Sequence, residues 1–216
     1  MGKLRGNLTD TDAPANPSTR EQAAFYLSTG SLNGNHKLRG GYYTPPKIAE
    51  FLCSWAVQDG DRLLEPSAGD GAIVHAATSR IGPSGRVVAV ELYADEAAKV
   101  AARGGPGTQT VIGDFFAWFQ DTRPEGSFDA VVGNPPFIRY QDFEEDHRRP
   151  AFELLVEEGV KPSRLINAWM PFVVVGTKAL REGGRLALVL PAELLQVGYA
   201  AGLREYLVRK YAELTI

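Results

Sequence analysis

Cysteine, histidine and long apolar runs are all scarce in this sequence. Its one cysteine, Cys53, excludes an internal disulfide or a cysteine metal cluster and is typical of a reducing compartment. His36, His75 and His147 have no partners at metal-ligand or triad spacing, so we expect them to be structural or exposed. No apolar run reaches membrane-spanning length, and residues 1–17 lack the apolar core of a signal peptide. We therefore expect a cytoplasmic protein with no bound metal and no membrane contact.

An excess of positive charge is also missing. The net charge is −3 and the pI is about 5.7, whereas a protein that holds nucleic acid by itself is usually basic. Either the chain binds no nucleic acid, or another segment makes most of the phosphate contacts. Arg139, Arg148 and Arg149 could touch phosphates, but a solvated charge cluster on a surface loop over 141–150 is the preferred interpretation.

What is present is an alternation of strand-like and helix-like segments. The 216 residues, 44% of them hydrophobic, suit one globular α/β domain. Apolar runs predict strands over 62–64, 86–90, 109–112, 130–132, 185–190 and 213–216. Helical spacing predicts helices over 18–28, 47–57, from 72 onward, and over 94–103, 151–159, 163–180 (kinked at Pro171) and 192–211. This alternation predicts a doubly wound, mostly parallel sheet.

The most informative stretch is Phe128–Tyr140, in which an apolar strand ends in Asn134-Pro135-Pro136-Phe137. The prolines cannot continue the strand, so a carboxamide, a freed carbonyl and an aromatic ring gather at its carboxyl end. The Asn134 side-chain oxygen and a nearby carbonyl suit the two hydrogens of a planar –NH2 group, and Phe137 offers a face for stacking. Read alone, an ordinary strand-ending Asn-Pro turn is the better interpretation.

A second strand end carries an acidic, glycine-containing turn, Glu65-Pro66-Ser67-Ala68-Gly69-Asp70-Gly71, followed by a helix. The spacing is neither GxGxxG nor that of a P-loop, so a pyrophosphate ligand is disfavoured. Glu65 and Asp70 instead suit a cation such as an ammonium or sulfonium. Glu91 ends the next strand, where an acidic residue commonly binds ribose hydroxyls.

Two further positions have both a functional and a structural interpretation. Thr44, followed by Pro45, stands where a helix N-cap belongs, and a plain cap is the better interpretation of that stretch by itself. Asp114 could accept from an adenine amino group while Phe115 covers the ring. A capped turn with Phe115 in the core explains the same residues equally well.

In order, Gly41-Tyr42-Tyr43-Thr44-Pro45-Pro46, the Glu65–Gly71 turn, Glu91, Asp114-Phe115 and Asn134-Pro135-Pro136-Phe137 resemble a known family. The set looks like the S-adenosylmethionine-dependent adenine-N6 DNA methyltransferases of the γ arrangement. The resemblance covers residues 41–216, which we expect to form the catalytic domain after a polar segment 1–40 with a short helix. It implies a class I, Rossmann-like, seven-stranded sheet of order 3-2-1-4-5-7-6, with strand seven antiparallel and the last strands truncated.

The same resemblance implies a role for each matching residue. Thr44, Glu65, Ala68 and Gly69 would hold the methionine end of the cofactor, and Glu91 its ribose. Leu92, Asp114 and Phe115 would hold its adenine, with Asn134 also beside the cofactor. The catalytic residues would be Asn134, Pro135 and Phe137, acting on an adenine flipped out of DNA. A target-recognition region outside the chain would make most DNA contacts, in a bacterial or archaeal restriction-modification or phage-defence system.

Three alternatives stay open. A protein glutamine-N5 methyltransferase of the release-factor type also acts on a planar NH2, although only a short segment precedes the cofactor turn here. The others are an RNA guanine-N2 methyltransferase and a non-catalytic cofactor-binding scaffold. Asn134 and the acidic turn argue against the scaffold.

Overall fold

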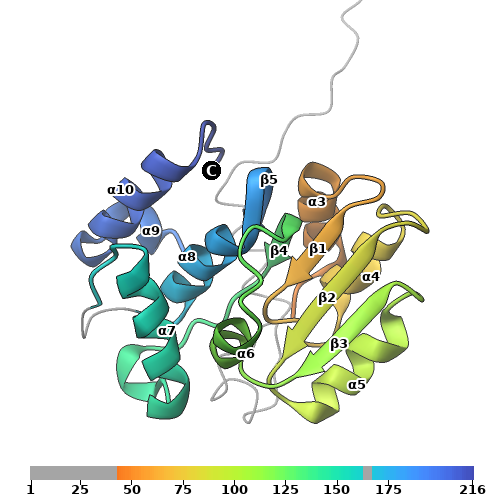
Figure 1. Ribbon diagram of the computed structural model, residues 1–216, viewed down its shortest axis with the longest axis horizontal. Helices are drawn as coiled ribbons and strands as arrows, with labels where there is room; N and C mark the ends of the chain where they lie inside the picture. Colours follow the sequence, from red (N-terminus) through yellow and green to blue (C-terminus); the bar gives the residue numbers. More distant parts are fainter. Residues whose placement is uncertain (1–42, 163–166) are drawn as a thin grey trace, which may run out of the picture.

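A computed structural model of the chain describes residues 43–162 and 167–216, the side chain of Tyr140 excepted. The segment 1–40, the helix expected over 18–28 and His36 lie outside the described residues. Elements carry the labels of Figure 1.

The described residues form a five-stranded parallel sheet in the order β3-β2-β1-β4-β5 (Figure 1). Its strands are β1 (Arg62–Glu65), β2 (Arg86–Glu91), β3 (Thr108–Ile112), β4 (Phe128–Gly133) and β5 (Leu180–Leu188). The expected order 3-2-1-4-5 is therefore confirmed. The strand order reverses between β1 and β4, which makes that point the topological switch point of the sheet.

Helices cover both faces of this sheet (Figure 1). Leu63, Ala89 and Ala130 point to the face covered by α3 (Pro46–Ala56), α4 (Ala72–Thr78) and α5 (Ala94–Arg103). Leu64 and Val131 point to the opposite face, covered by α6 (Phe115–Thr122), α7 (Glu145–Glu157) and α8 (Trp169–Ala179). Because successive strand residues alternate between two apolar layers, the strands read as continuous apolar runs.

The first described helix differs from expectation at its start and on its buried face. Pro45, not Thr44, is the N-cap of α3, and no side chain caps the helix. Ala49, Cys53 and Ala56 form its buried face, while Phe51 is 65% exposed and Trp55 51% exposed. The helical spacing of large apolar residues predicts this helix, but small residues form its core side, which lets the helix approach the sheet closely.

The middle of the chain holds more helix than the sequence indicated. No helix was expected over α6, whose run of large aromatics lacks a polar face. α7 begins at Glu145 and follows a short 3-10 turn at Tyr140–Asp142, so most of the expected loop 141–150 is helical. α8 begins at Trp169, which places Pro171 in its first turn. There a missing N–H costs no helical hydrogen bond, and no kink is needed.

The C-terminal part differs most. β5 begins at Leu180 and includes Gly183 and Gly184, with a register shift against β4 between Phe128 and Ala130. The helix expected over 192–211 is divided into α9 (Glu193–Gln196), a 3-10 turn (Gly198–Ala200) and α10 (Ala201–Lys210). Residues 213–216 are not a strand, so that prediction was wrong.

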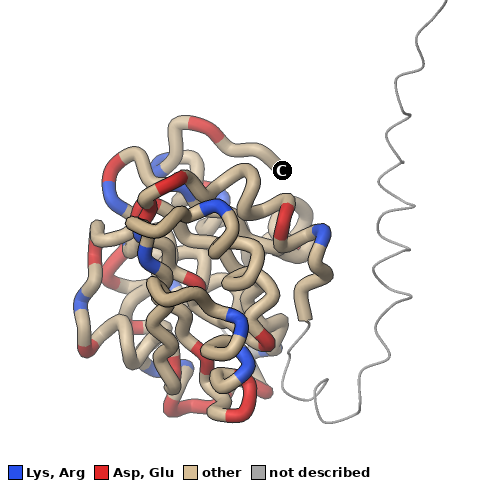
Figure 2. The backbone as a smooth tube through the Cα atoms, turned by 90° about the vertical axis from the view of Figure 1, so that its right-hand side faces the viewer, with Lys and Arg blue, Asp and Glu red and all other residues tan. Residues whose placement is uncertain are grey.

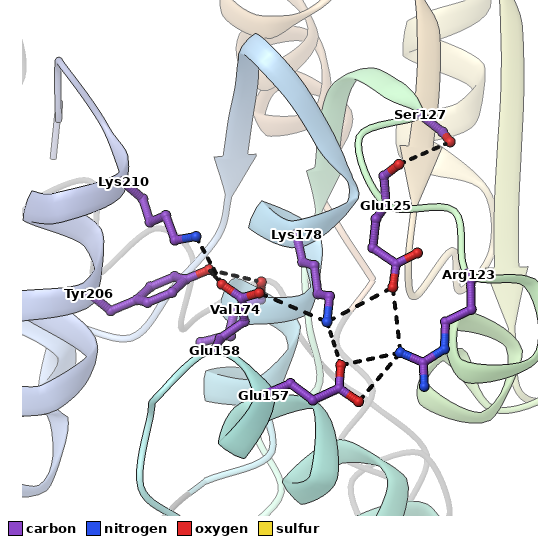
Figure 3. A network of polar contacts seen from close by, with 9 residues as sticks. All are labelled: Arg123, Glu125, Ser127, Glu157, Glu158, Val174, Lys178, Tyr206 and Lys210. Atoms are coloured by element: carbon purple, nitrogen blue, oxygen red, sulfur yellow. Dashed lines mark hydrogen bonds and ion pairs between the residues drawn. The ribbon is translucent and has the colours of Figure 1, made fainter.

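A network of charges fastens the helices on the α6–α8 face to α10 (Figure 3). Lys178 forms an ion pair with Glu157, and its Nζ lies 3.9 Å from carboxylate oxygens of Glu125 and Glu158. Glu158 also pairs with Lys210 of α10 at 2.9 Å. Only 15% of the Lys178 side chain is exposed, so its removal would leave three carboxylates facing one another.

We therefore expect Lys178→Met to lower the free energy of unfolding by about 1–3 kcal/mol, less than the roughly 3–5 kcal/mol for breaking a fully buried pair, because the Glu157 side chain is 37% exposed. Arg181→Met is the matched control, since Arg181 pairs with Asp129 at 2.5 Å but is 54% exposed. Its cost should stay below about 1 kcal/mol. Urea unfolding of both variants measures the difference, and equal costs would contradict a special role for Lys178.

Figure 2 shows the backbone positions of Lys and Arg interspersed with those of Asp and Glu. Among the described residues, no helix is both long and apolar enough to cross a membrane.

Candidate active site

The candidate site lies at the switch point, where the carboxyl ends of β1 and β4 are neighbours. Leu64 pairs with Val131, so Glu65 at the end of β1 and Asn134 just after β4 emerge side by side. A Cβ on Gly133 would lie 3.2 Å from Pro66 Cδ. Glycine at this position therefore lets the cofactor turn and the Asn-Pro-Pro-Phe segment approach closely.

A small pocket that opens to solvent lies at this edge. Its lining brings together three segments that are far apart in the sequence, and includes Tyr43, Thr44, Glu65, Ser67, Gly69, Asp70 and Asn134. The family resemblance of the sequence predicts that these three segments form one site. The pocket brings them together but does not test the role of any single residue.

Asn134 is held by both of the other segments. Its Nδ2 donates to Thr44 Oγ1 at 3.2 Å, and its backbone carbonyl accepts from Ser67 Oγ at 3.3 Å. The Thr44 hydroxyl thus orients the carboxamide rather than capping α3. With Nδ2 used in this way, the side-chain oxygen is the atom of the amide suited to accept from a ligand.

Pro135 and Phe137 follow Asn134 in the same segment. Pro135 is buried. Phe137 is half-buried and packs against the apolar cluster formed mainly by α8 and α10. This packing holds the Phe137 ring in place. The use of the ring as a stacking surface for a substrate stays a prediction.

Glu65 is the most unusual group in the site, because it is a carboxyl with 1% exposure on an apolar strand. Among the described residues, its Oε2 has no hydrogen-bond partner. Burial raises the pKa of Glu65 well above its usual range, and the charges of Glu91 and Asp70 raise it further. A hydrogen bond from the backbone of Val74 lowers the pKa in part. A buried acceptor without a partner on a pocket wall fits a cationic donor, such as a ligand ammonium.

The turn around Glu65 is fixed by its own backbone. Ala68 N donates to the Val90 carbonyl and Gly69 N donates to Glu91 Oε2, each within 2.9 Å. The N–H groups of Ala68 and Gly69 are therefore used within the protein. The Ala68 carbonyl accepts from Gly71 N at 2.9 Å, but a carbonyl oxygen has two acceptor sites, so the carbonyls of Ala68 and Gly69 can still accept from a ligand. Asp70 is paired with Arg103 at 2.8 Å, which leaves Glu65 as the main acidic group of the turn.

Glu91 both faces this turn and braces it. Oε1 accepts from Tyr93 N at 2.9 Å and Oε2 accepts from Gly69 N at 2.8 Å. Burial raises the pKa of Glu91, and these two hydrogen bonds oppose that shift. Glu91 therefore also positions the turn, so its loss should affect the turn as well as any contact with a ligand.

We expect Glu91→Ala to weaken S-adenosylmethionine binding by about 10-fold or more, since it removes an acceptor and releases the turn. Glu91→Gln is the control, because its amide oxygen can keep one of the two backbone hydrogen bonds. Calorimetry measures the affinity, and hydrogen exchange at Gly69 measures the release. Unchanged exchange in the alanine variant would contradict the bracing role.

Asp114, Phe115 and Leu92 lie at the neighbouring strand ends. Asp114 caps α6 by accepting from Ala117 N at 2.9 Å. Phe115 is 3% exposed and stacks on Phe172 with a centroid separation of 5.3 Å, while Leu92 is 38% exposed. The structure thus contains the capped turn and core aromatic of the structural interpretation. Contact of these three residues with an adenine stays a prediction.

Two features of the site were not identified from the sequence. Tyr43 Oη donates to Glu96 Oε1 at 3.0 Å, and Lys99 pairs with the same oxygen at 2.6 Å, which ties the segment before α3 to α5. His147, expected to lack partners, lies 3.2 Å from Asp114. Neither contact has a signal in local spacing, because each joins distant segments. Of the other residues singled out, His75, Arg139 and Arg149 are exposed, and Arg148 donates to the Phe143 carbonyl at 3.1 Å.

A parallel sheet of this order, with helices on both faces and a switch-point pocket of this kind, is the class I methyltransferase fold. A solved structure with the same fold is the type I restriction-modification system methyltransferase subunit from Streptococcus thermophilus. It superposes with a TM-score of 0.61 at 19% identity, over 78% of this chain and 38% of that one.

The chain belongs to the Eco57I restriction-modification methylase family, whose model matches residues 108–216. A curated relative, the type II methyltransferase M.XamI of Xanthomonas campestris pv. amaranthicola, is 29% identical over 180 residues, covering 78% of this chain and 33% of the relative. M.TthHB8I of Thermus thermophilus, also a type II methyltransferase, is 30% identical over 178 residues, covering 79% and 39%. The chain thus spans between a third and two fifths of the length of these relatives.

Proposed function

We propose that residues 41–216 form the catalytic domain of a DNA methyltransferase that transfers a methyl group from S-adenosylmethionine to the N6 amine of adenine. The observation that carries this proposal is the arrangement of Asn134, which Thr44 and Ser67 hold in the pocket that contains the buried carboxyl of Glu65. Membership of a restriction-modification methylase family supports DNA as the substrate. We also propose that the enzyme works in the cytoplasm of a bacterium or archaeon and that a region outside this chain selects the DNA site.

The residues of the pocket suit the cofactor. S-adenosylmethionine, when bound, supplies an electrophilic methyl group on a sulfonium and carries a cationic amine. Glu65 would accept from that amine, together with the carbonyls of Ala68 and Gly69. Glu91 would accept from the ribose hydroxyls, with Leu92, Asp114 and Phe115 at the adenine.

The chemistry assigned to Asn134 follows from the weakness of its substrate. The lone pair of an aromatic amine is delocalised into the ring, so the nitrogen is a poor nucleophile. The Asn134 side-chain oxygen and the Pro135 carbonyl would accept the two N–H groups and favour a pyramidal nitrogen. They would also offset the positive charge that develops on nitrogen in the transition state. Phe137 would hold the ring, so that the lone pair points along the line of transfer.

Transfer of tritium-labelled methyl groups from S-adenosylmethionine tests the proposal directly. The substrates are adenine-containing DNA, a structured RNA and a release factor, each at high concentration. A single-stranded DNA should be included, because it needs no base flipping. We expect label in DNA, recovered as N6-methyladenine. Label in the release factor or in RNA guanine alone would support the alternative substrates and overturn the choice of adenine.

A further inference from the structure

His147 makes a specific contact that the assigned roles of the site do not include. Its Nδ1 lies 3.2 Å from Asp114 Oδ2, and its Nε2 lies 3.7 Å from Glu144 Oε2. The other oxygen of Asp114 accepts from Ala117 N at 2.9 Å. Only 14% of the Asp114 side chain and 27% of the His147 side chain are exposed. The carboxylate at the end of β3 is thus held from two sides, by the backbone of α6 and by a side chain of α7.

The helix that carries His147 begins soon after the Asn134–Phe137 segment, and the connection between them is also fastened to α6. The ring of Phe143 packs against Phe116 with centroids 6.2 Å apart. Arg148 Nη1 donates to the Phe143 carbonyl at 3.1 Å. The start of α7 is therefore fixed next to the N-terminus of α6, where Asp114 lies. The packing of these two helices brings His147 next to Asp114.

We propose that His147 is a positioning residue, which aims the carboxylate of Asp114 at the adenine amine of the cofactor. This inference rests on the proposed function, because it assigns Asp114 to that amine. Each oxygen of Asp114 keeps an acceptor site after its present hydrogen bond, so the carboxylate can still receive an N–H from a ligand. Because the Asp114 carboxylate is already held in place, less conformational entropy is lost when the ligand binds.

Burial raises the pKa of Asp114, while the backbone hydrogen bond from Ala117 and the charge of His147 oppose that shift and favour the ionised carboxylate. The ionised carboxylate is a pure acceptor, which is the form that suits the N–H groups of an adenine amine.

The test compares the full chain with His147→Ala and His147→Asn, using calorimetry with S-adenosylhomocysteine at one fixed pH. His147→Ala should bind about 10-fold more weakly than wild type. His147→Asn should recover most of the lost affinity, because its amide can donate to Asp114.

A second ligand separates positioning from a merely structural role. In the deaminated analogue S-inosylhomocysteine a 6-oxo group replaces the amine, so wild type and His147→Ala should bind it equally. A similar loss for both ligands, an unchanged affinity in His147→Ala, or no recovery in His147→Asn would each overturn the inference alone. No binding of S-adenosylhomocysteine by the wild type would overturn the proposed function as well.

Discussion

Replacing Asn134 with alanine should lower the rate of methyl transfer by at least about 100-fold, while the affinity for S-adenosylmethionine stays near that of the wild type. The magnitude is that of removing one preorganised hydrogen-bonding group aimed at developing charge. We expect the affinity for the cofactor to be kept because the groups assigned to its amine and ribose lie on β1 and β2, not on the segment of Asn134. Single-turnover transfer to an adenine-containing strand and calorimetry measure the two quantities.

Thr44→Val is the matched control for this prediction. It keeps the shape of Thr44 but removes the oxygen that accepts from Asn134 Nδ2 at 3.2 Å. The carboxamide would then be present but less firmly oriented, so the rate should fall by about 10-fold, which is less than in Asn134→Ala. A fully active Asn134→Ala variant would remove Asn134 from the mechanism. A variant that loses both transfer and cofactor binding would instead indicate a structural role.

Replacing Glu65 with glutamine should have opposite effects on function and stability. The affinity for S-adenosylmethionine should fall by about 10- to 100-fold, because a charged hydrogen bond to the ligand amine is lost. The ligand-free protein should become more stable near neutral pH by about 1–3 kcal/mol, because a buried carboxylate with an oxygen that lacks a partner is replaced by a neutral group.

The pH dependence of that gain follows from the direction of the shift. Burial raises the folded-state pKa of Glu65, so the folded protein binds this proton more tightly than the unfolded chain. The wild type therefore loses stability as the pH rises from the unfolded pKa of about 4.3 through the raised folded value. Glu65→Gln should escape this loss, and the two proteins should converge near about pH 4. Thermal unfolding of the wild type and Glu65→Gln from about pH 4 upward, with and without ligand, measures this difference in stability. A constant difference at all pH values would show that Glu65 is not the titrating group.

The sequence alone predicted the part of the fold that local patterns determine. Apolar runs such as 86–90 are buried on both faces, and their order along the chain allowed only a few parallel topologies. Glu65 and Asn134 were expected at one edge because the carboxyl ends of parallel strands meet there, whereas Thr44 was placed in the site only by the resemblance to the methyltransferase family.

The errors arose where tertiary packing outweighs local pattern. On α3 the large aromatics Phe51 and Trp55 are exposed and the small residues are buried, because the helix lies close to the sheet. α6 consists largely of aromatics, and without an alternating polar face it gave no helical period. β5 extends through Gly183 and Gly184, which read as a helix end, because pairing with β4 continues across a register shift. The His147–Asp114 contact joins helices whose approach no local spacing encodes.

The central claim is that one pocket at the β1–β4 switch point places a sulfonium cofactor opposite the carboxamide of Asn134. A crystal structure of the chain with S-adenosylhomocysteine tests this claim most directly. The account predicts the homocysteine amine within hydrogen-bonding distance of Glu65, the ribose at Glu91 and the sulfur facing Asn134. A ligand bound elsewhere, or bound here with its sulfur turned away from Asn134, would contradict it.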